Sequence, residues 1–236
     1  MSTTLLQLRD ACKDRADMSG STGPDQFIPD PTWNQYINAS FAEFHDIVVR
    51  NDVRFYLTSS QFAIPQGSNT QALPADFMIA DGVERSWDNS GLQSTWYDIY
   101  KFPWRERNWG NNPYWSLLLP PQVRYNIAGN NLVFQPNANA SGLYQLWYYP
   151  IAPVLVNDSD TFDDQRYWFE YVIVDVAMKA LQKEESDVSV LMAQKANLTS
   201  RIQLMGADRD FAWPEQIGRR GNGNPGNGFG GGSMGF

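Results

Sequence analysis

An acidic run in the second half of the chain has a spacing that raises the question of a metal site. The run contains Asp158, Asp160, Asp163 and Asp164. A helix–loop–helix calcium site beginning at Asp158 needs glycine at its sixth position and a bidentate glutamate at its twelfth. The sequence has Asp163 and Phe169 at those positions. The run therefore favours a solvated helix start, where acids complement the positive end of the helix dipole, over a metal site.

The residues that serve most often as nucleophile and base are scarce. The chain has one histidine, His45, and one cysteine, Cys12, and they fall in two different predicted helices. A single cysteine excludes an intramolecular disulfide and a metal site built on several cysteines. The sequence also lacks GxSxG, P-loop and GxGxxG motifs, and nothing singles out two carboxylates for acid–base work. We predict that the protein is not an enzyme and has no cofactor and no metal.

Tryptophan is the remaining residue type with a potential binding role. Five tryptophans lie in a loop-rich central region, where exposed rings can stack on sugars: Trp87, Trp96, Trp104, Trp109 and Trp115. The competing interpretation is that these rings fill a thin β layer or a subunit interface, where aromatic residues are favoured. We keep a carbohydrate-binding surface module as the alternative to the function inferred below.

Two long helices are predicted between Thr161 and Met205. Asp160 or Thr161 is the expected N-cap of the first, whose two apolar stripes predict a place at the centre of a core. The chain turns polar at residues 184–187, where Ser186 is the expected cap of the second helix. Apolar residues recur there at spacings of three and four, interrupted by Lys195: Val188, Leu191, Leu198, Ile202 and Met205. This narrow seam suits a neighbouring helix of the same chain or of another subunit.

Two further helices and a β-rich region precede this pair. Thr3 or Thr4 is the expected cap of a short helix reaching Asp17. Asp30 is the expected N-cap of an amphipathic helix whose first position is a proline. The apolar face of that helix is formed by Trp33, Ile37, Phe41, Phe44 and Val48. Helical periodicity is absent from residues 53–149, where residues 123–149 predict a three-stranded antiparallel meander and residues 104–108 a turn of helix.

The C-terminal segment differs from the rest in composition. Nine of the nineteen residues from Gly218 to Phe236 are glycine, which predicts a flexible arm. Its expected partner-binding residues are Arg219, Arg220, Phe229 and Phe236. The predicted fold class is therefore α+β: a helical bundle (residues 1–50 and 151–205), an inserted antiparallel β-rich region (51–150) and a flexible Gly-rich C-terminal arm (206–236).

The net charge of −8 argues against a surface that grips the phosphates of nucleic acid. The N-terminus has charges too early for a signal peptide, and no stretch approaches the roughly 18 apolar residues of a membrane span. We therefore expect a chain made in the cytoplasm, without a membrane partner.

Three segments carry a resemblance to a known family: DPTWNQYINASFAEFHDIVV, LPADF at residues 73–77, and FEYVIVDVAMKALQKEESDVSVL. Together with the order of the elements, they make most of residues 1–217 similar to the head-to-tail adaptor (connector) proteins of short-tailed bacteriophages. The resemblance implies a non-enzymatic structural protein of the virion, at the head–tail junction. It implies a ring of identical subunits, usually twelve, between the portal protein and the tail (nozzle) protein. DNA would pass through the ring without specific binding, and in some members the C-terminal arm reaches into the portal.

The charge pattern of residues 157–190 fits such a channel. This segment has nine acids against three bases, and three of the acids lie close together in the sequence: Glu184, Glu185 and Asp187. A channel wall that repels phosphate lets DNA slide, so these three residues are channel-lining candidates. A solvated outer surface is the competing interpretation.

Overall fold

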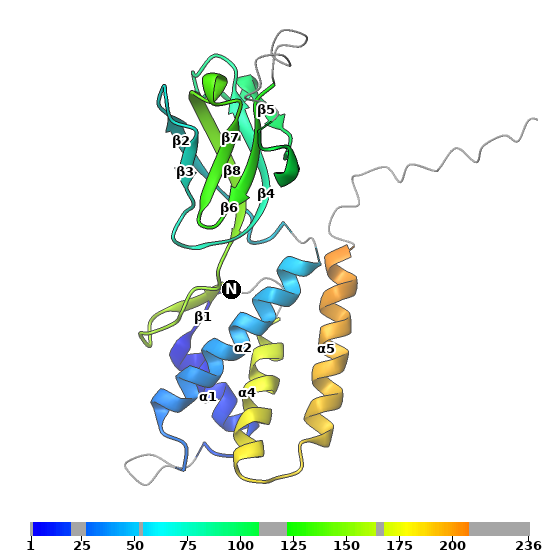
Figure 1. The fold of residues 1–236 in the computed structure, drawn as a ribbon. Coiled ribbons are helices and arrows are strands. Elements are labelled where there is room, and N and C mark those ends of the chain that lie inside the picture. Colours follow the sequence, from blue (N-terminus) through cyan, green and yellow to red (C-terminus); the bar gives the residue numbers. More distant parts are fainter. Residues whose placement is uncertain (1, 20–26, 52–53, 109–121, 164–167, 208–236) are drawn as a thin grey trace, which may run out of the picture.

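The computed structural model describes residues 2–19, 27–51, 54–108, 122–163 and 168–207. The four described helices lie together, and the described strands, except a short ribbon at the N-terminus, gather at one end of the helical bundle (Figure 1). Both sheets and the ribbon pair their strands antiparallel, which confirms the predicted α+β class.

The first two helices begin where local signals place them. In α1 (Leu5–Arg15), the Gln7 N–H donates to Thr4 Oγ1 at 3.2 Å and the Thr4 N–H donates to Gln7 Oε1 at 3.0 Å, a complete capping box. Helix α2 (Asp30–Arg50) has its N-cap at Pro29. Asp30 is therefore its first helical residue and not the predicted cap. Its carboxylate instead accepts a hydrogen bond from Lys13 Nζ at 2.6 Å.

The helix predicted from Thr161 starts later, so this prediction is wrong. Residues Thr161–Asp163 form β9, which pairs with β1 (Ser2–Thr4), and α4 spans Phe169–Lys183. The Asp160 carboxylate does not cap a helix but accepts the N–H groups of Val156 and Asn157 at 2.7 and 2.8 Å. Because residues 161–163 pair with the distant residues 2–4, they form a strand and do not begin the helix that the local sequence favours.

The break after α4 is closed by the chain itself. The Glu185 N–H donates to the Gln182 carbonyl and the Ser186 N–H to the Leu181 carbonyl, at 3.2 and 3.0 Å, with Glu185 at φ 60°. This is the Schellman pattern. Helix α5 spans Ser189–Ala207. The carboxylate of Asp187 accepts the Ser189 N–H at 2.9 Å, so Asp187 and not the predicted Ser186 satisfies the start of α5.

One apolar core lies between the helices. Helices α1, α2 and α4 supply most of it, including the whole predicted face of α2, and among the residues of α5 whose side chains are described only Ile202 lies within it. Leu191 and Leu198 are partly buried against the same core. The predicted seam of α5 therefore faces helices of its own chain.

A second core fills the β-rich end. Strands β2 (Thr58–Ile64), β8 (Gly142–Pro150), β4 (Phe77–Ser86) and β5 (Trp96–Ile99) form one sheet in that order. Strands β3 (Thr70–Ala72), β7 (Asn131–Gln135) and β6 (Arg124–Ala128) form the other. The two are joined where the Phe102 N–H donates to the Tyr125 carbonyl and the Tyr125 N–H to the Tyr100 carbonyl, at 2.9 and 3.1 Å.

The predicted meander is right for two strands and wrong for the third. Strands β6 and β7 form a hairpin whose first loop residue, Gly129, has φ 58°. Strand β8 does not pair with β7 but lies between β2 and β4. This arrangement lets Tyr144 and Leu146 meet Phe134 inside the same buried cluster, instead of lying beside it in one sheet. The predicted turn of helix near residue 104 is a 3-10 turn, Trp104–Glu106.

The two buried clusters draw on separate parts of the chain: one from residues 5–48 and 155–202, the other from residues 64–148. The division into a helical unit, a β-rich unit and an arm stays a prediction. Residues 208–236, with Arg219, Arg220, Phe229 and Phe236, lie outside the described residues.

Candidate interaction surface on the helical bundle

A buried carboxylate connects three helices. Asp175 lies in α4 among valines and has no exposed surface. Lys195 Nζ of α5 donates to its Oδ1 at 2.6 Å, Lys179 Nζ lies 2.6 Å from its Oδ2, and the Ser40 hydroxyl of α2 donates to the same oxygen. A buried charge of this kind is tolerated because it is paired and hydrogen-bonded.

A second acid completes the charge cluster. Glu43 of α2 accepts from Lys179 at 3.0 Å and from Lys195 at 3.1 Å. Burial raises the pKa of Asp175, but its hydrogen bonds to Lys179, Lys195 and Ser40 outweigh burial and hold that pKa below its usual value. Burial lowers the pKa of Lys195, but Asp175 and Glu43 outweigh this and raise it. Asp175 and Lys195 therefore stay ionised, and the cluster they form with Glu43 and Lys179 holds α5 against α2 and α4.

Lys195 is the residue that sequence reasoning misjudged. It interrupts the apolar seam of α5, yet the structure makes it the main polar attachment of that helix. A signal was present: Asp175 is an acid in the otherwise apolar stretch VIVDVAM, and such an acid needs a cation from another element.

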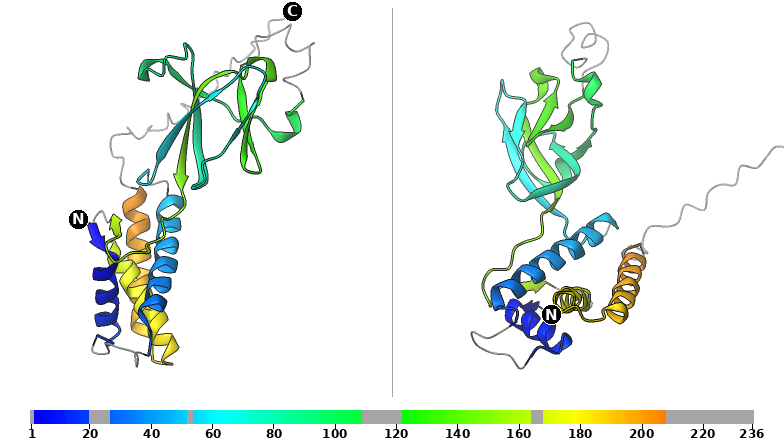
Figure 2. Two further views of the ribbon diagram at one scale, coloured as in Figure 1. Left: turned by 90° about the vertical axis from the view of Figure 1, so that its left-hand side faces the viewer. Right: turned by 60° about the horizontal axis from the view of Figure 1, so that its bottom comes forward.

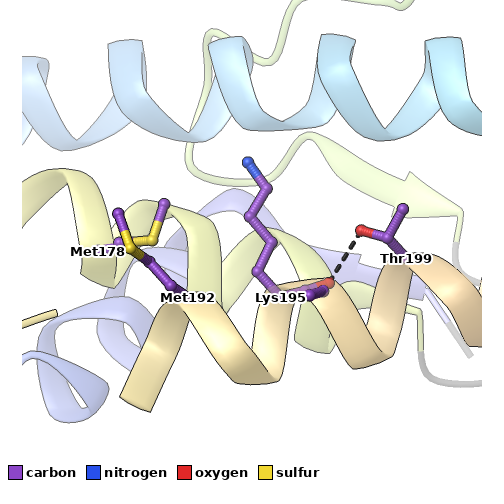
Figure 3. A pocket seen from close by; sticks show the side chains of 5 residues that line it. Met178, Met192, Lys195 and Thr199 are labelled. Atoms are coloured by element: carbon purple, nitrogen blue, oxygen red, sulfur yellow. Dashed lines mark hydrogen bonds between the residues drawn. The ribbon is translucent and has the colours of Figure 1, made fainter. Parts of the chain in front are cut away.

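A recess lies beside this attachment, between α4 and α5. It has a volume of about 370 Å³ and is lined by Met178, Met192, Lys195, Ala196 and Thr199. Figure 3 shows the Lys195 side chain extending toward α2, while the two methionines meet at the other end. The Thr199 hydroxyl donates to the Lys195 carbonyl at 2.8 Å, so the polar groups here are bonded to each other. The exposed surface of the recess therefore consists mainly of thioether and methyl groups, and flexible methionine side chains can adapt to partners of different shapes.

The rest of α5 exposes a weakly charged face. Val190, Met192 and Leu204 are all more than half exposed. Among the described exposed residues of α5, Arg201 is the only charged one. Large apolar side chains on a helix face with so little charge are typical of a surface that contacts another protein.

The three channel-lining candidates occupy the turn between α4 and α5. Glu184, Glu185 and Asp187 are all exposed, and the turn lies at the end of the bundle away from the β-rich region (Figure 1). Hydrogen bonds from the Ser189 N–H and hydroxyl lower the pKa of Asp187. The Asp187 side chain thus has a local structural role, whereas the side chains of Glu184 and Glu185 contribute charge to the exposed surface.

The tryptophans lie on separate elements of the β-rich end. Trp87 follows β4 and is 76% exposed, Trp96 is half-buried in β5, and Trp104 stacks on Phe102 with ring centroids 6.4 Å apart. Trp109 and Trp115 lie outside the described residues.

The other residue types considered for chemistry have structural surroundings. His45 and Cys12 are both buried, and burial lowers the pKa of His45 and raises that of Cys12, so both are neutral at pH 7. Asp158 pairs with Arg9 at 3.0 Å. Within the described ranges, no three His, Cys, Asp or Glu side chains form a group that could hold a metal ion.

None of the described helices is long and apolar enough to cross a membrane. No curated protein matches the chain. The family model for the SU10 adaptor protein matches residues 3–221, which include every described helix and strand except the first residue of β1. A match over nearly the whole length shows the family, and the chain belongs to the SU10 adaptor protein family.

Proposed function

We propose that the protein is a bacteriophage head-to-tail adaptor, and that its subunits form a ring joining the capsid portal to the tail and lining the DNA exit channel. The observation that carries the proposal is the family match, which spans both the helical bundle and the β-rich region. Membership of a phage adaptor family supports a structural role in the virion and association with portal and tail proteins, and the proposal includes no catalytic role.

The finer parts of the proposal rest on surface chemistry. A subunit with different faces on its two sides forms a closed ring by heterologous contacts, and the family resemblance gives twelve as the expected number. The exposed acids Glu184, Glu185 and Asp187 would line the channel, where negative charge keeps DNA from adhering to the wall. DNA then passes through without specific binding.

The decisive experiment is electron cryomicroscopy of the purified protein mixed with its portal protein. We expect a ring of adaptor subunits on one end of the portal, and a monomer or weak oligomer when the portal is omitted. Subunits that stay monomeric at saturating portal would contradict the proposal. Deleting residues 218–236 tests the arm in the same assay, because it should weaken assembly while leaving the Tm of the subunit nearly unchanged.

The alternative function is a carbohydrate-binding module of the virion. The observation that favours it is the exposure of Trp87 and Trp104, which is 47% exposed. Glycan arrays probed with the wild-type protein and with Trp87→Ala separate the two functions. Binding that is lost in the variant would support the alternative, whereas an adaptor gives no glycan signal.

A further inference from the structure

Helix α5 carries a second stripe on the side that faces away from its own bundle. Its members recur at spacings of three and four, offset by two residues from the inward seam: Val190, Ala193, Asn197, Ser200 and Leu204. An offset of two residues is about 200° around a helix, so this outward stripe is opposite the seam that packs on the core. Val190 is 67% and Leu204 69% exposed. The spacing is that of a helix ridge that can pack against another chain, and the small residues between its two apolar ends allow a close approach.

A second apolar surface lies on the segment that returns the chain from β8 to β9. Leu155 is buried, and Asn38 of α2 fixes it by donating to its carbonyl at 2.9 Å and accepting its N–H at 2.8 Å. In an extended chain the neighbours of an inward residue point outward. Val154 and Val156 are accordingly 70% and 69% exposed on a backbone that is held in place. Leu6 adds to this surface, because its N–H bonds to the Asp158 carbonyl at 3.2 Å. We call Leu6, Val154 and Val156 the strap face.

The two surfaces lie on opposite sides of the helical bundle. Figure 2 shows α5 on one side and the chain before β9 on the other, with α2 and α4 between them, and Figure 1 agrees. Their exposed charges also differ in sign. Arg201 is the one exposed charge described on α5, whereas the strap face is flanked by the exposed acids Asp10 and Asp158, of which Asp158 also pairs with Arg9.

We propose that the outward stripe of α5 in one subunit packs on the strap face of the next copy of the chain. The inference rests on the ring put forward above and assigns its contact surfaces. Different patches on opposite sides of one subunit give a heterologous contact, which repeats around an axis until the ring closes. Arg201 then faces the acids beside the neighbour's strap face, and such complementarity fixes the orientation of the contact.

The size of the stripe explains why the contact would need the ring. From Val190 to Leu204 the helix is about 21 Å long and roughly 10 Å wide, so the stripe covers on the order of 200 Å². A stable protein–protein interface buries about 800 Å² per partner. The stripe alone is too small for a stable dimer in solution, and it becomes effective when a portal holds the subunits side by side.

Cysteine cross-linking on the assembled particle tests the contact directly. Leu204→Cys and Val154→Cys are introduced together, and the assembly is treated with a short bis-maleimide. Cys12 has no exposed surface and does not compete. We expect a ladder of dimers, trimers and larger species in the double variant and none in either single variant. Dimers from Leu204→Cys alone would show that two α5 helices pack together, and cross-links to the portal would give α5 a different partner. Either result overturns the proposal.

Substitution provides an independent measurement and separates this inference from the proposed function. Leu204→Glu and Val154→Glu should each leave the Tm of the subunit within a few degrees of wild type but reduce ring occupancy on the portal at least tenfold. Leu92→Glu, at an exposed apolar residue of the β-rich end, is the matched control and should assemble normally. If the wild type forms no ring, the proposed function fails. If rings form equally well with all three variants, only the assigned contact fails.

Discussion

The two buried clusters of this molecule are stabilised at their margins by different forces. The β-rich cluster is closed by aromatic contacts. The ring centroids of Phe134 and Tyr144 lie 4.5 Å apart, and the Tyr144 hydroxyl donates to the Ala140 carbonyl at 2.7 Å. The helical cluster is apolar between α1, α2 and α4, whereas its contact with α5 combines an apolar seam with the charges of Asp175, Lys179, Lys195 and Glu43. The β-rich end should therefore be insensitive to pH and salt, whereas the attachment of α5 should respond to both.

The largest expected effect is in the aromatic cluster. Phe134→Ala removes a fully buried ring and leaves a cavity, so the free energy of unfolding should fall by about 3–5 kcal/mol. Urea unfolding at low and high salt measures it, and the loss should be the same at both. Trp87→Ala, at a mainly exposed ring, is the control, and its free energy of unfolding should stay within about 0.5 kcal/mol of the wild-type value. A loss for Phe134→Ala that depended on salt would remove the contrast between the two clusters.

A somewhat smaller effect is expected at the attachment of α5. Lys195→Ala leaves the buried Asp175 with one lysine fewer, and we expect a loss of about 3 kcal/mol, since Lys179 and Ser40 remain in place. Hydrogen exchange should become at least tenfold faster at the amides of residues 190–204. The amides of α2 should change much less, because its apolar contacts with α1 and α4 persist.

Arg201→Ala is the matched control for that experiment. Arg201 is an exposed cation on the same helix, and none of the ion pairs recorded for the described residues includes it. Equal acceleration of exchange in α2 and α5 would show that α5 is an integral part of the bundle and does not open separately.

The pH dependence distinguishes the charge cluster from ordinary surface acids. The pKa of Asp175 is depressed in the folded protein from its usual 3.8, so its stabilising contribution is present above that pH. It is lost as the pH falls through the lower folded value. Asp30, Asp88, Asp160 and Asp187 have lowered pKa values too. The test is therefore the difference in the free energy of unfolding between wild type and Asp175→Asn, measured as a function of pH. This difference should shrink as the pH drops below about 4. Parallel curves would show that Asp175 does not titrate with unfolding.

Local signals were enough to predict the elements whose boundaries depend on nearby residues. The capping residue Thr4, the proline after Asp30 and the glycine between β6 and β7 each act within a few residues of themselves. They were therefore visible in the sequence. The failures involve partners that are remote in the chain. Thr161–Asp163 leaves the predicted helix because it pairs with residues 2–4, and β8 leaves the meander because β2 and β4 pair with it.

The candidate interaction surface was less predictable for the same reason. The heptad spacing of the inward seam was visible, but it indicated no particular partner. Only the positions of α2 and α4 show that the seam is already occupied and that the opposite stripe is free for another chain. The role of Lys195 depends on Asp175, twenty residues away, and on Glu43 in another helix.

The smallest effect on stability, and the most direct test of the channel, is expected at the acidic turn. Replacing Glu184, Glu185 and Asp187 by lysine should lower the stability of the subunit only slightly, mainly through the lost hydrogen bonds between Asp187 and Ser189. The double variant Glu184→Lys/Glu185→Lys keeps those bonds and is the cleaner probe. Rings should still form and DNA should be retained. Ejection should slow, and more so at low salt, because lysines that face the DNA attract phosphate and screening is then weak.

The control variant Asp81→Lys/Asp98→Lys makes the same charge change at exposed residues of the β-rich end, and particles that carry it should eject DNA normally. Normal ejection from fully assembled particles carrying the Glu184/Glu185 variant would place the acidic turn on the outside of the ring, because two cations per subunit cannot line a channel without slowing DNA.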